Sequence, residues 1–152
     1  MSAALAAFAD ELEDLGALWK PTAQVRSPAP RLDLTAIGRA GFVLRVQAYD
    51  VADEFVEPER NEVEIAIVAH DEVGRELLET TFSLAQADAA LSNIRSIVSE
   101  EIAIELDFDD DDEWLGSGTV RTAALKPPSE TERVSRRSFH GTFDWPQPLS
   151  EG

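Results

Sequence analysis

The residues best suited to acid–base or metal chemistry are two histidines and a serine. His70 and His140 are the two histidines of the chain, and Ser138 lies two positions before the second. A catalytic pair of His70 with Ser138, or a metal site of both imidazoles with carboxylates, requires residues distant in sequence to meet in space. Neither histidine belongs to a local signature such as Gly-x-Ser-x-Gly or His-Glu-x-x-His. We therefore interpret both as structural or surface residues and predict no catalytic residue.

An acidic run at residues 107–113 is the second candidate, because alternating Asp residues can present oxygen ligands to Ca²⁺. The spacing does not fit an EF-hand loop, since Asp112 stands where glycine is required and Gly118 where the bidentate glutamate belongs. Residues 116–118 are Gly-rich but lack the lysine and following helix of a phosphate loop. We expect a solvated hairpin tip followed by a flexible turn, and we predict no metal site and no cofactor.

The composition narrows the class of protein. The 152 residues include 30 acidic and 13 basic side chains and no cysteine, giving a net charge of −17. The lack of cysteine excludes thiolate nucleophiles, redox pairs, zinc ribbons and iron–sulfur clusters. The negative charge argues against direct nucleic-acid binding, which depends on Lys and Arg neutralising phosphates. No apolar run approaches the roughly 18 residues of a membrane span and no secretion signal opens the chain, so we expect neither a membrane-spanning nor a classically secreted protein.

Lysine is scarce among the basic residues, with Lys20 and Lys126 as its two occurrences. Arginine codons of a GC-rich genome account for this pattern. An extreme halophile accounts for it as well, because acidic, lysine-poor surfaces keep proteins soluble at high salt. We favour the halophile slightly, in which case the acidity is an adaptation to the solvent.

The C-terminal part of the chain is locally basic and aromatic. Residues 119–145 hold five basic and three acidic side chains, whereas residues 1–118 hold eight basic and 26 acidic side chains. Arginine and aromatic side chains are concentrated in protein interfaces, and complementary charges can dock one copy of a chain on another. The alternative is that the aromatic residues fill the core. The predicted interface residues are Arg133, Arg136, Arg137, Phe139, Phe143, Trp145 and Trp114.

Hydrophobic periodicity indicates which elements position these residues. Apolar residues at spacings of three and four predict an amphipathic helix over residues 2–18. Ser83 followed by Gln86 is typical of a capping box and predicts a second helix over residues 84–99. The last residues, 146–152, form a tail after a single domain at 1–145.

Alternating apolar residues predict strands, with a turn at residues 71–74. The strands are expected at 41–49, 61–70, 76–82, 102–108, 119–125 and 133–145, with a short further strand at 31–35. Without the short one, the order is α-β-β-β-α-β-β-β. This order predicts an α+β domain in which two helices cover one face of a mainly antiparallel sheet.

The order of elements resembles the tail-completion or tail-terminator (neck) proteins of tailed viruses. The resemblance lies in the helix at 2–18, the strand at 61–70, the helix after Ser83, and the segment 136–143. It implies a non-enzymatic, ring-forming subunit that caps a tail tube and joins it to the capsid connector, and therefore a virion or cytoplasmic location. The loop at 52–61 and the tip at 114–118 depart from the family pattern, so the resemblance does not assign the face that lines the lumen.

The leading hypothesis is therefore a structural assembly protein that forms a homo-oligomer or ring and contacts neighbouring assembly proteins. On this hypothesis, Arg136→Glu with Arg137→Glu abolishes assembly without unfolding the monomer. A second hypothesis is an acidic inhibitor, such as an immunity or anti-restriction protein that occupies a cationic partner or mimics DNA. A third is an enzyme with a dispersed active site, which a cleft holding a histidine beside a carboxylate and a hydroxyl would favour.

Overall fold

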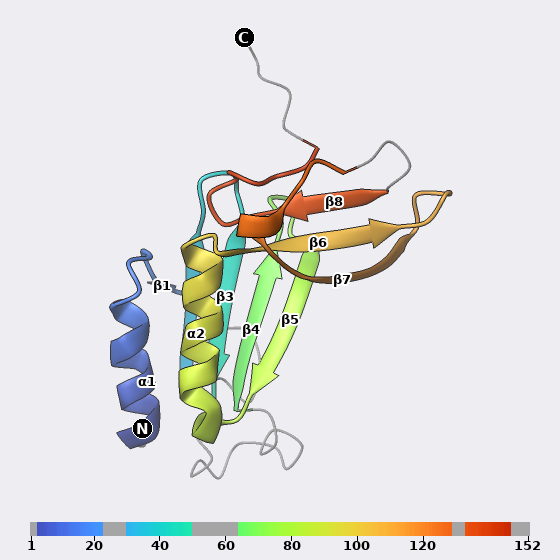
Figure 1. Ribbon diagram of the computed structural model, residues 1–152. Coiled ribbons are helices and arrows are strands. Elements are labelled where there is room, and N and C mark those ends of the chain that lie inside the picture. Colours follow the sequence, from blue (N-terminus) through green and yellow to red (C-terminus); the bar gives the residue numbers. More distant parts are fainter. Residues whose placement is uncertain (1–2, 23–29, 50–63, 129–132, 147–152) are drawn as a thin grey trace.

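The computed structural model describes residues 3–22, 30–49, 64–128 and 133–146, which form an α+β fold in the predicted order (Figure 1). The two α-helices and two 3-10 turns accompany antiparallel strands. In chain order the elements are α1 (Ala3–Glu13), β1 (Lys20–Pro21), β2 (Leu32–Ile37), β3 (Val43–Ala48), β4 (Ile65–His70), β5 (Glu76–Phe82), η2 (Leu84–Gln86), α2 (Ala87–Val98), β6 (Ile102–Phe108), β7 (Trp114–Arg121), η3 (Thr122–Ala124) and β8 (Val134–Arg137). The short strand expected near residue 31 is present as β2.

The strands belong to two sheets, a division that the sequence pattern did not predict. Strands β1 to β5 form one sheet in chain order, and β6 lies between β7 and β8 in the second. Neighbouring strands in both sheets run antiparallel. In Figure 1 the turn joining β6 to β7 projects on the side away from the helices.

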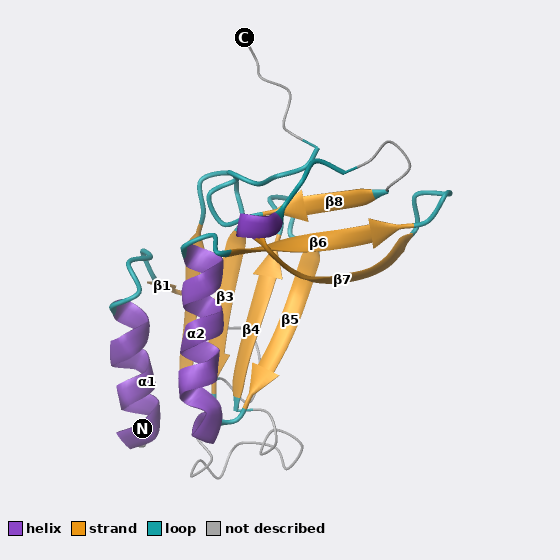
Figure 2. Cartoon of the chain, viewed as in Figure 1, coloured by secondary structure: helices purple, strands orange, loops and turns teal. Residues whose placement is uncertain are grey.

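The helices lie side by side over the five-stranded sheet, and both sheets share one core (Figure 2). Each helix turns one apolar stripe inward, as expected for amphipathic helices. The core includes Leu5, Phe8 and Leu12 of α1, Leu91, Ile94 and Ile97 of α2, Leu44, Val46, Ile65 and Ile67 of the large sheet, and Ile104 and Leu106 of β6. None of the described helices is long and apolar enough to cross a membrane.

The helices are shorter than the periodicity suggested. The first ends at Glu13, because the backbone N–H groups of residues 14 and 15 donate to the carbonyls three positions earlier and Gly16 adopts a φ of +80°. The second begins with the turn η2, where the backbone N–H of Ser83 donates to Gln86 Oε1 at 3.1 Å. This contact is the glutamine half of the predicted capping box.

The last two strands differ from the prediction. Residues 116–118, expected as a flexible turn, lie inside β7 and pair with β6. The strand expected at 119–125 therefore begins at Trp114 and ends at Arg121, after a bulge opposite residues 107 and 108. The strand expected at 133–145 ends at Arg137. Residues 52–61, the predicted long loop, lie outside the described residues.

Candidate interaction surface

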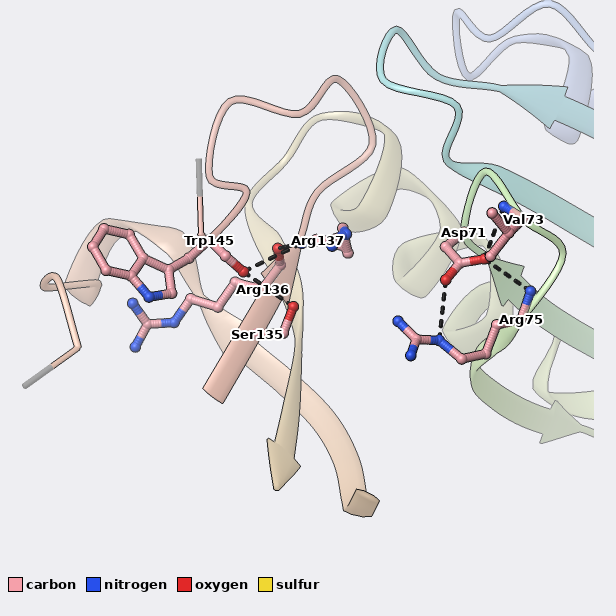
Figure 3. Close-up of polar contacts among 7 residues, drawn as sticks. All are labelled: Asp71, Val73, Arg75, Ser135, Arg136, Arg137 and Trp145. Atoms are coloured by element: carbon pink, nitrogen blue, oxygen red, sulfur yellow. Dashed lines mark hydrogen bonds and ion pairs between the residues drawn. The ribbon is translucent and has the colours of Figure 1, made fainter. Parts of the chain in front are cut away.

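The basic and aromatic segment at residues 133–145 folds back on itself. After β8 the chain turns, and Trp145 pairs with Arg136. The backbone N–H groups of these two residues donate to each other's carbonyl oxygens at 2.8 and 2.9 Å. Ser135 Oγ and Arg137 Nη1 donate to the same Trp145 carbonyl at 3.0 and 3.2 Å (Figure 3). Backbone pairing thus closes this segment into a compact loop.

The guanidinium groups of Arg136 and Arg137 donate to acceptors of their own chain. Arg136 is 9% exposed, and its Nε donates to Glu105 Oε2 at 2.8 Å from the facing position of β6. Its Nη1 donates to the carbonyl of Lys126 at 2.7 Å, which holds the segment after η3 against the small sheet. Arg137 Nη1 donates to the carbonyl of Arg136 at 2.9 Å. The two arginines are therefore engaged in holding their own chain together.

Ser138 and Asp144 fix the two ends of the C-terminal loop. The backbone N–H of Ser138 donates to Asp144 Oδ1 at 2.8 Å, and the backbone N–H of Phe143 donates to Ser138 Oγ at 2.9 Å. Burial raises the pKa of Asp144 above its ordinary value, although the Ser138 N–H and the charge of Arg137 oppose this. Ser138 is 2% exposed. Its hydroxyl is a structural contact of the loop.

Glu100 anchors the same loop from the turn between α2 and β6. Its carboxylate accepts the backbone N–H groups of His140 and Thr142, both at 3.2 Å, and the hydroxyl of Thr142 at 2.6 Å. Burial acts to raise the pKa of Glu100, but these hydrogen bonds and one from Ser138 outweigh it and leave the pKa below its ordinary value. One carboxylate therefore ties the loop to the end of α2.

Phe139 docks the loop on the large sheet. It is buried in the shared core, and its ring meets that of Phe42 edge-on with the centroids 5.8 Å apart. The backbone of Gly38, in the turn between β2 and β3, lies against it, since a Cβ on Gly38 would come 1.6 Å from the carbonyl oxygen of Phe139. Glycine is thus required there for the two chain segments to approach.

The acidic tip at residues 109–113 is an ordered turn between β6 and β7. The carboxylate of Asp109 accepts the backbone N–H groups of Asp111 and Glu113, both at 2.9 Å, as in an Asx turn. Arg133 reaches this tip, with Nη1 at 2.5 Å from Asp112 Oδ1. The remaining carboxylates of the tip extend into solvent, as expected from the sequence.

Two consecutive large apolar side chains follow the tip. Trp114 is 60% exposed and Leu115 is 67% exposed. They lie at the bulge in β7, where the register with β6 shifts. Two large apolar side chains exposed at consecutive positions of a projecting hairpin are candidates for contact with another chain, and tryptophan is enriched among residues that dominate binding energy.

Strand β7 also has a free edge, since β6 is its strand partner within the described part of the chain. The backbone N–H of Thr122 donates to the carbonyl of Glu101 at 3.0 Å. Because hydrogen-bonded pairs alternate along an antiparallel ladder, Ser117 and Thr119 turn their backbone groups away from β6. An edge strand with unpaired N–H and C=O groups can accept a strand from another chain.

A polar pocket of about 450 Å³ lies where the end of β7 meets α2 and β5. Its lining includes Phe82, Ser92, Asn93, Ser96, Thr119 and Arg121, and none of its lining residues is acidic. Asn93 Oδ1 is buried without a hydrogen-bond partner. Arg121 makes no ion pair with the described residues and also borders a second hollow that contains Lys126.

The histidines do not assemble a reactive group within the described residues. His70 ends β4, while His140 lies in the C-terminal loop with its ring against Phe139 at 4.9 Å. Neither imidazole hydrogen-bonds a serine hydroxyl or a carboxylate among the residues described. No cluster of three or more His, Asp or Glu side chains in that part of the chain could hold a metal ion.

The turn between β4 and β5 is organised by a buried carboxylate. Asp71, 4% exposed, accepts the backbone N–H groups of Val73 and Arg75 at 3.1 and 2.8 Å, and Arg75 Nε at 3.0 Å (Figure 3). This arrangement presents Val73 to solvent. The turn is a second exposed apolar point, but a single valine without a neighbouring aromatic side chain.

The seven residues predicted as an interface thus have different environments. Trp114, Arg133 and Trp145 are exposed, Arg137 and Phe143 are partly buried, and Arg136 and Phe139 are buried. The interface remains a prediction, with its accessible members near the β6–β7 hairpin and the end of the loop. The sequence prediction did not include Leu115 or Arg121. Leu115 could have been found from its position after Trp114 beside a polar tip, whereas no local pattern marks Arg121.

Comparison of the chain with family models, curated proteins and solved structures found no match.

Proposed function

We propose that this protein is a non-enzymatic assembly subunit that acts through contacts between protein chains, and that the β6–β7 hairpin is its principal contact. The observation that carries the proposal is the exposure of Trp114 and Leu115 next to each other on the projecting hairpin. Burying apolar surface contributes about 25 cal/mol per Å². Two large side chains held in water on a protruding element are therefore a favourable contact for another chain.

The free edge of β7 supports the same proposal. Backbone groups of an edge strand can pair with a strand of a second chain, while exposed side chains beside it supply specificity. Trp145, 36% exposed, and Arg133 extend the candidate contact across the small sheet. The predicted homo-oligomer or ring uses such surfaces.

The more specific form of the proposal is a virion neck or tail-completion subunit of a tailed virus from a halophilic host. It is supported by the resemblance in element order and by the net charge of −17. The partners are then other copies of the chain and the neighbouring assembly proteins. Ring-shaped particles in negative-stain electron micrographs are the expected result for this form.

An acidic inhibitor is the second candidate, and the tip favours it. The side chains of Asp110 and Asp112 extend into solvent at the end of the hairpin, where they could reach a cationic partner. An inhibitor of this kind acts as a monomer or dimer, whereas an assembly subunit forms larger species. The oligomeric state therefore separates the two candidates.

The test is the molar mass in solution by light scattering, at about 0.15 M and at multimolar salt. We expect the full chain to form an oligomer that the pair Trp114→Ala with Leu115→Ser dissociates. The matched control is Leu18→Ser, which removes a side chain that is 83% exposed after α1. A wild-type chain that stays monomeric at every concentration and salt, or a control that dissociates the oligomer equally, overturns the proposal.

A further inference from the structure

The pocket between α2 and β7 has a chemistry unlike the rest of this acidic chain. Ser92 and Ser96 of α2 and Thr119 of β7 supply hydroxyl groups, and Arg121 supplies a guanidinium group without an ion-pair partner among the described residues. None of the described residues that line the pocket is acidic, although 30 of the 152 residues of the chain are. An arginine and several hydroxyl donors, with no acid among the described lining residues, favour an anionic ligand.

The tip at residues 109–113 of this same chain has the complementary chemistry. It carries five consecutive carboxylates, of which Asp110 and Asp112 share the single arginine Arg133. The pocket volume of about 450 Å³ lies within the range of about 300–1,000 Å³ typical of ligand sites. The hollow on the other side of Arg121 is lined by Lys126, Arg136 and Glu105, two further basic side chains against one acidic side chain.

The tip cannot fill the pocket of its own molecule. Glu113 precedes β7 and Arg121 ends it, so the strand separates them by eight residues, or about 26 Å at about 3.3 Å per residue. The contact is therefore between molecules, and donor and acceptor are different surfaces of each copy. Such heterologous contacts repeat from copy to copy and close into a ring or continue as a filament.

We propose that the α2–β7 pocket is a carboxylate-binding site that receives the acidic tip (residues 109–113) of a second copy of this chain. The inference rests on the proposed assembly function and names the partner and the site of its contact. Docking of the tip also brings Trp114 and Leu115, which follow it directly, onto the surface of the neighbouring copy. The electrostatic part of the contact weakens with salt, while the apolar part persists.

The test uses two full-length variants that each damage one half of the contact. Arg121→Glu reverses the charge of the pocket and leaves the tip intact. Asp110→Lys with Asp111→Lys changes the net charge of the tip from −5 to −1 and leaves the pocket intact; both residues are exposed, so the fold is preserved. Arg39→Glu, an exposed arginine in the turn between β2 and β3, is the matched control for the change in charge.

At about 0.15 M salt we expect each variant alone to fall to the mass of one chain, 16.7 kDa, while the Arg39 control keeps the wild-type mass. An equimolar mixture of the two variants should form a species of twice that mass and nothing larger, because one intact tip meets one intact pocket. Circular dichroism and urea unfolding are the controls that check that each variant is folded.

Three outcomes overturn the inference. If wild type assembles and the Trp114/Leu115 variant dissociates, but Arg121→Glu keeps the full mass, the pocket is not the contact and the assembly function stands. If the mixture stays monomeric, the tip and the pocket are not partners. If millimolar acetate or phosphate raises the urea midpoint of the Arg121→Glu variant as much as that of the wild-type chain, the pocket is not a carboxylate site.

Discussion

Replacing Arg136 with alanine should destabilise the folded monomer, although the sequence placed this arginine on an interface. In the structure its guanidinium group donates to Glu105 Oε2 at 2.8 Å and to the carbonyl of Lys126 at 2.7 Å. The side chain is 11% exposed and that of Glu105 is 24% exposed. Its removal leaves a largely buried carboxylate and a carbonyl without their donor.

The magnitude follows from these two contacts. A hydrogen bond to a charged group contributes about 1.5–3 kcal/mol, and removing one partner of a buried ion pair costs about 3–5 kcal/mol. Because water can reach part of Glu105, we expect a loss of about 2–4 kcal/mol in the free energy of unfolding. For a chain of this length, that loss lowers Tm by about 4–16 °C.

The assay is urea unfolding of the monomer, followed by circular dichroism, with Arg133→Ala as the control. Arg133 approaches Asp112 more closely, at 2.5 Å, but its side chain is 46% exposed. Exposed ion pairs contribute about 0–1 kcal/mol, so the control should change stability by less than 1 kcal/mol. Burial rather than distance is thus predicted to decide the outcome.

A double-mutant cycle with Glu105→Gln should give a coupling of about 1–3 kcal/mol. The reasoning is refuted if Arg136→Ala unfolds at the same urea concentration as wild type while it abolishes assembly. In that case Arg136 is an interface residue, as the sequence predicted. The expected instability also means that loss of assembly in Arg136→Glu with Arg137→Glu does not by itself identify an interface, because the monomer is expected to be destabilised as well.

Three further predictions concern the C-terminal loop. Gly38→Ala should cost about 1–3 kcal/mol in urea unfolding, since its Cβ overlaps the carbonyl of Phe139, whereas Gly118→Ala, with open space around it, should change stability by less than 0.5 kcal/mol; equal losses contradict the close approach. Glu100→Gln should reduce stability at pH 7 and have little effect at pH 3. The folded state lowers the pKa of Glu100, so its carboxylate stabilises the fold above the pKa of the unfolded chain, and this stabilisation is lost as the pH falls through the pKa of the folded chain. Asp144→Asn should behave oppositely and gain stability relative to wild type as the pH rises above 3.8, because burial raises the pKa of Asp144. Urea midpoints at constant ionic strength measure the pH dependence of both variants. Profiles that run parallel for wild type and variants contradict the two pH predictions.

The elements that local patterning specifies were predictable. The alternation of apolar residues located β4 and the hairpin it forms with β5, because one-sided burial requires a period of two. Gln86 at the third position after Ser83 marked the start of the second helix, since its amide reaches the free N–H at that end. The acidic tip was predictable as well, because carboxylates in sequence remain in solvent.

Other features depended on residues far apart in the chain. Gly116-Ser117-Gly118 has the composition of a turn but forms part of β7, because the neighbouring strand β6 supplies hydrogen bonds that outweigh its weak strand propensity. The alternation after Arg137 suggested a long strand, yet Glu100, 38 residues before Ser138, anchors a loop there.

The sequence by itself determined the α+β class, the order of elements and the acidic, cysteine-free character of the surface, because these depend on composition and on the spacing of neighbouring side chains. Tertiary structure alone decided the division into two sheets, the burial of Arg136 against Glu105, and the meeting of Arg121 with α2 in a pocket where no described lining residue is acidic. Arg133 and Arg136 are the same residue type three positions apart. One lies at a solvated tip and the other faces a buried carboxylate, a difference set by the strand packed opposite rather than by the local sequence.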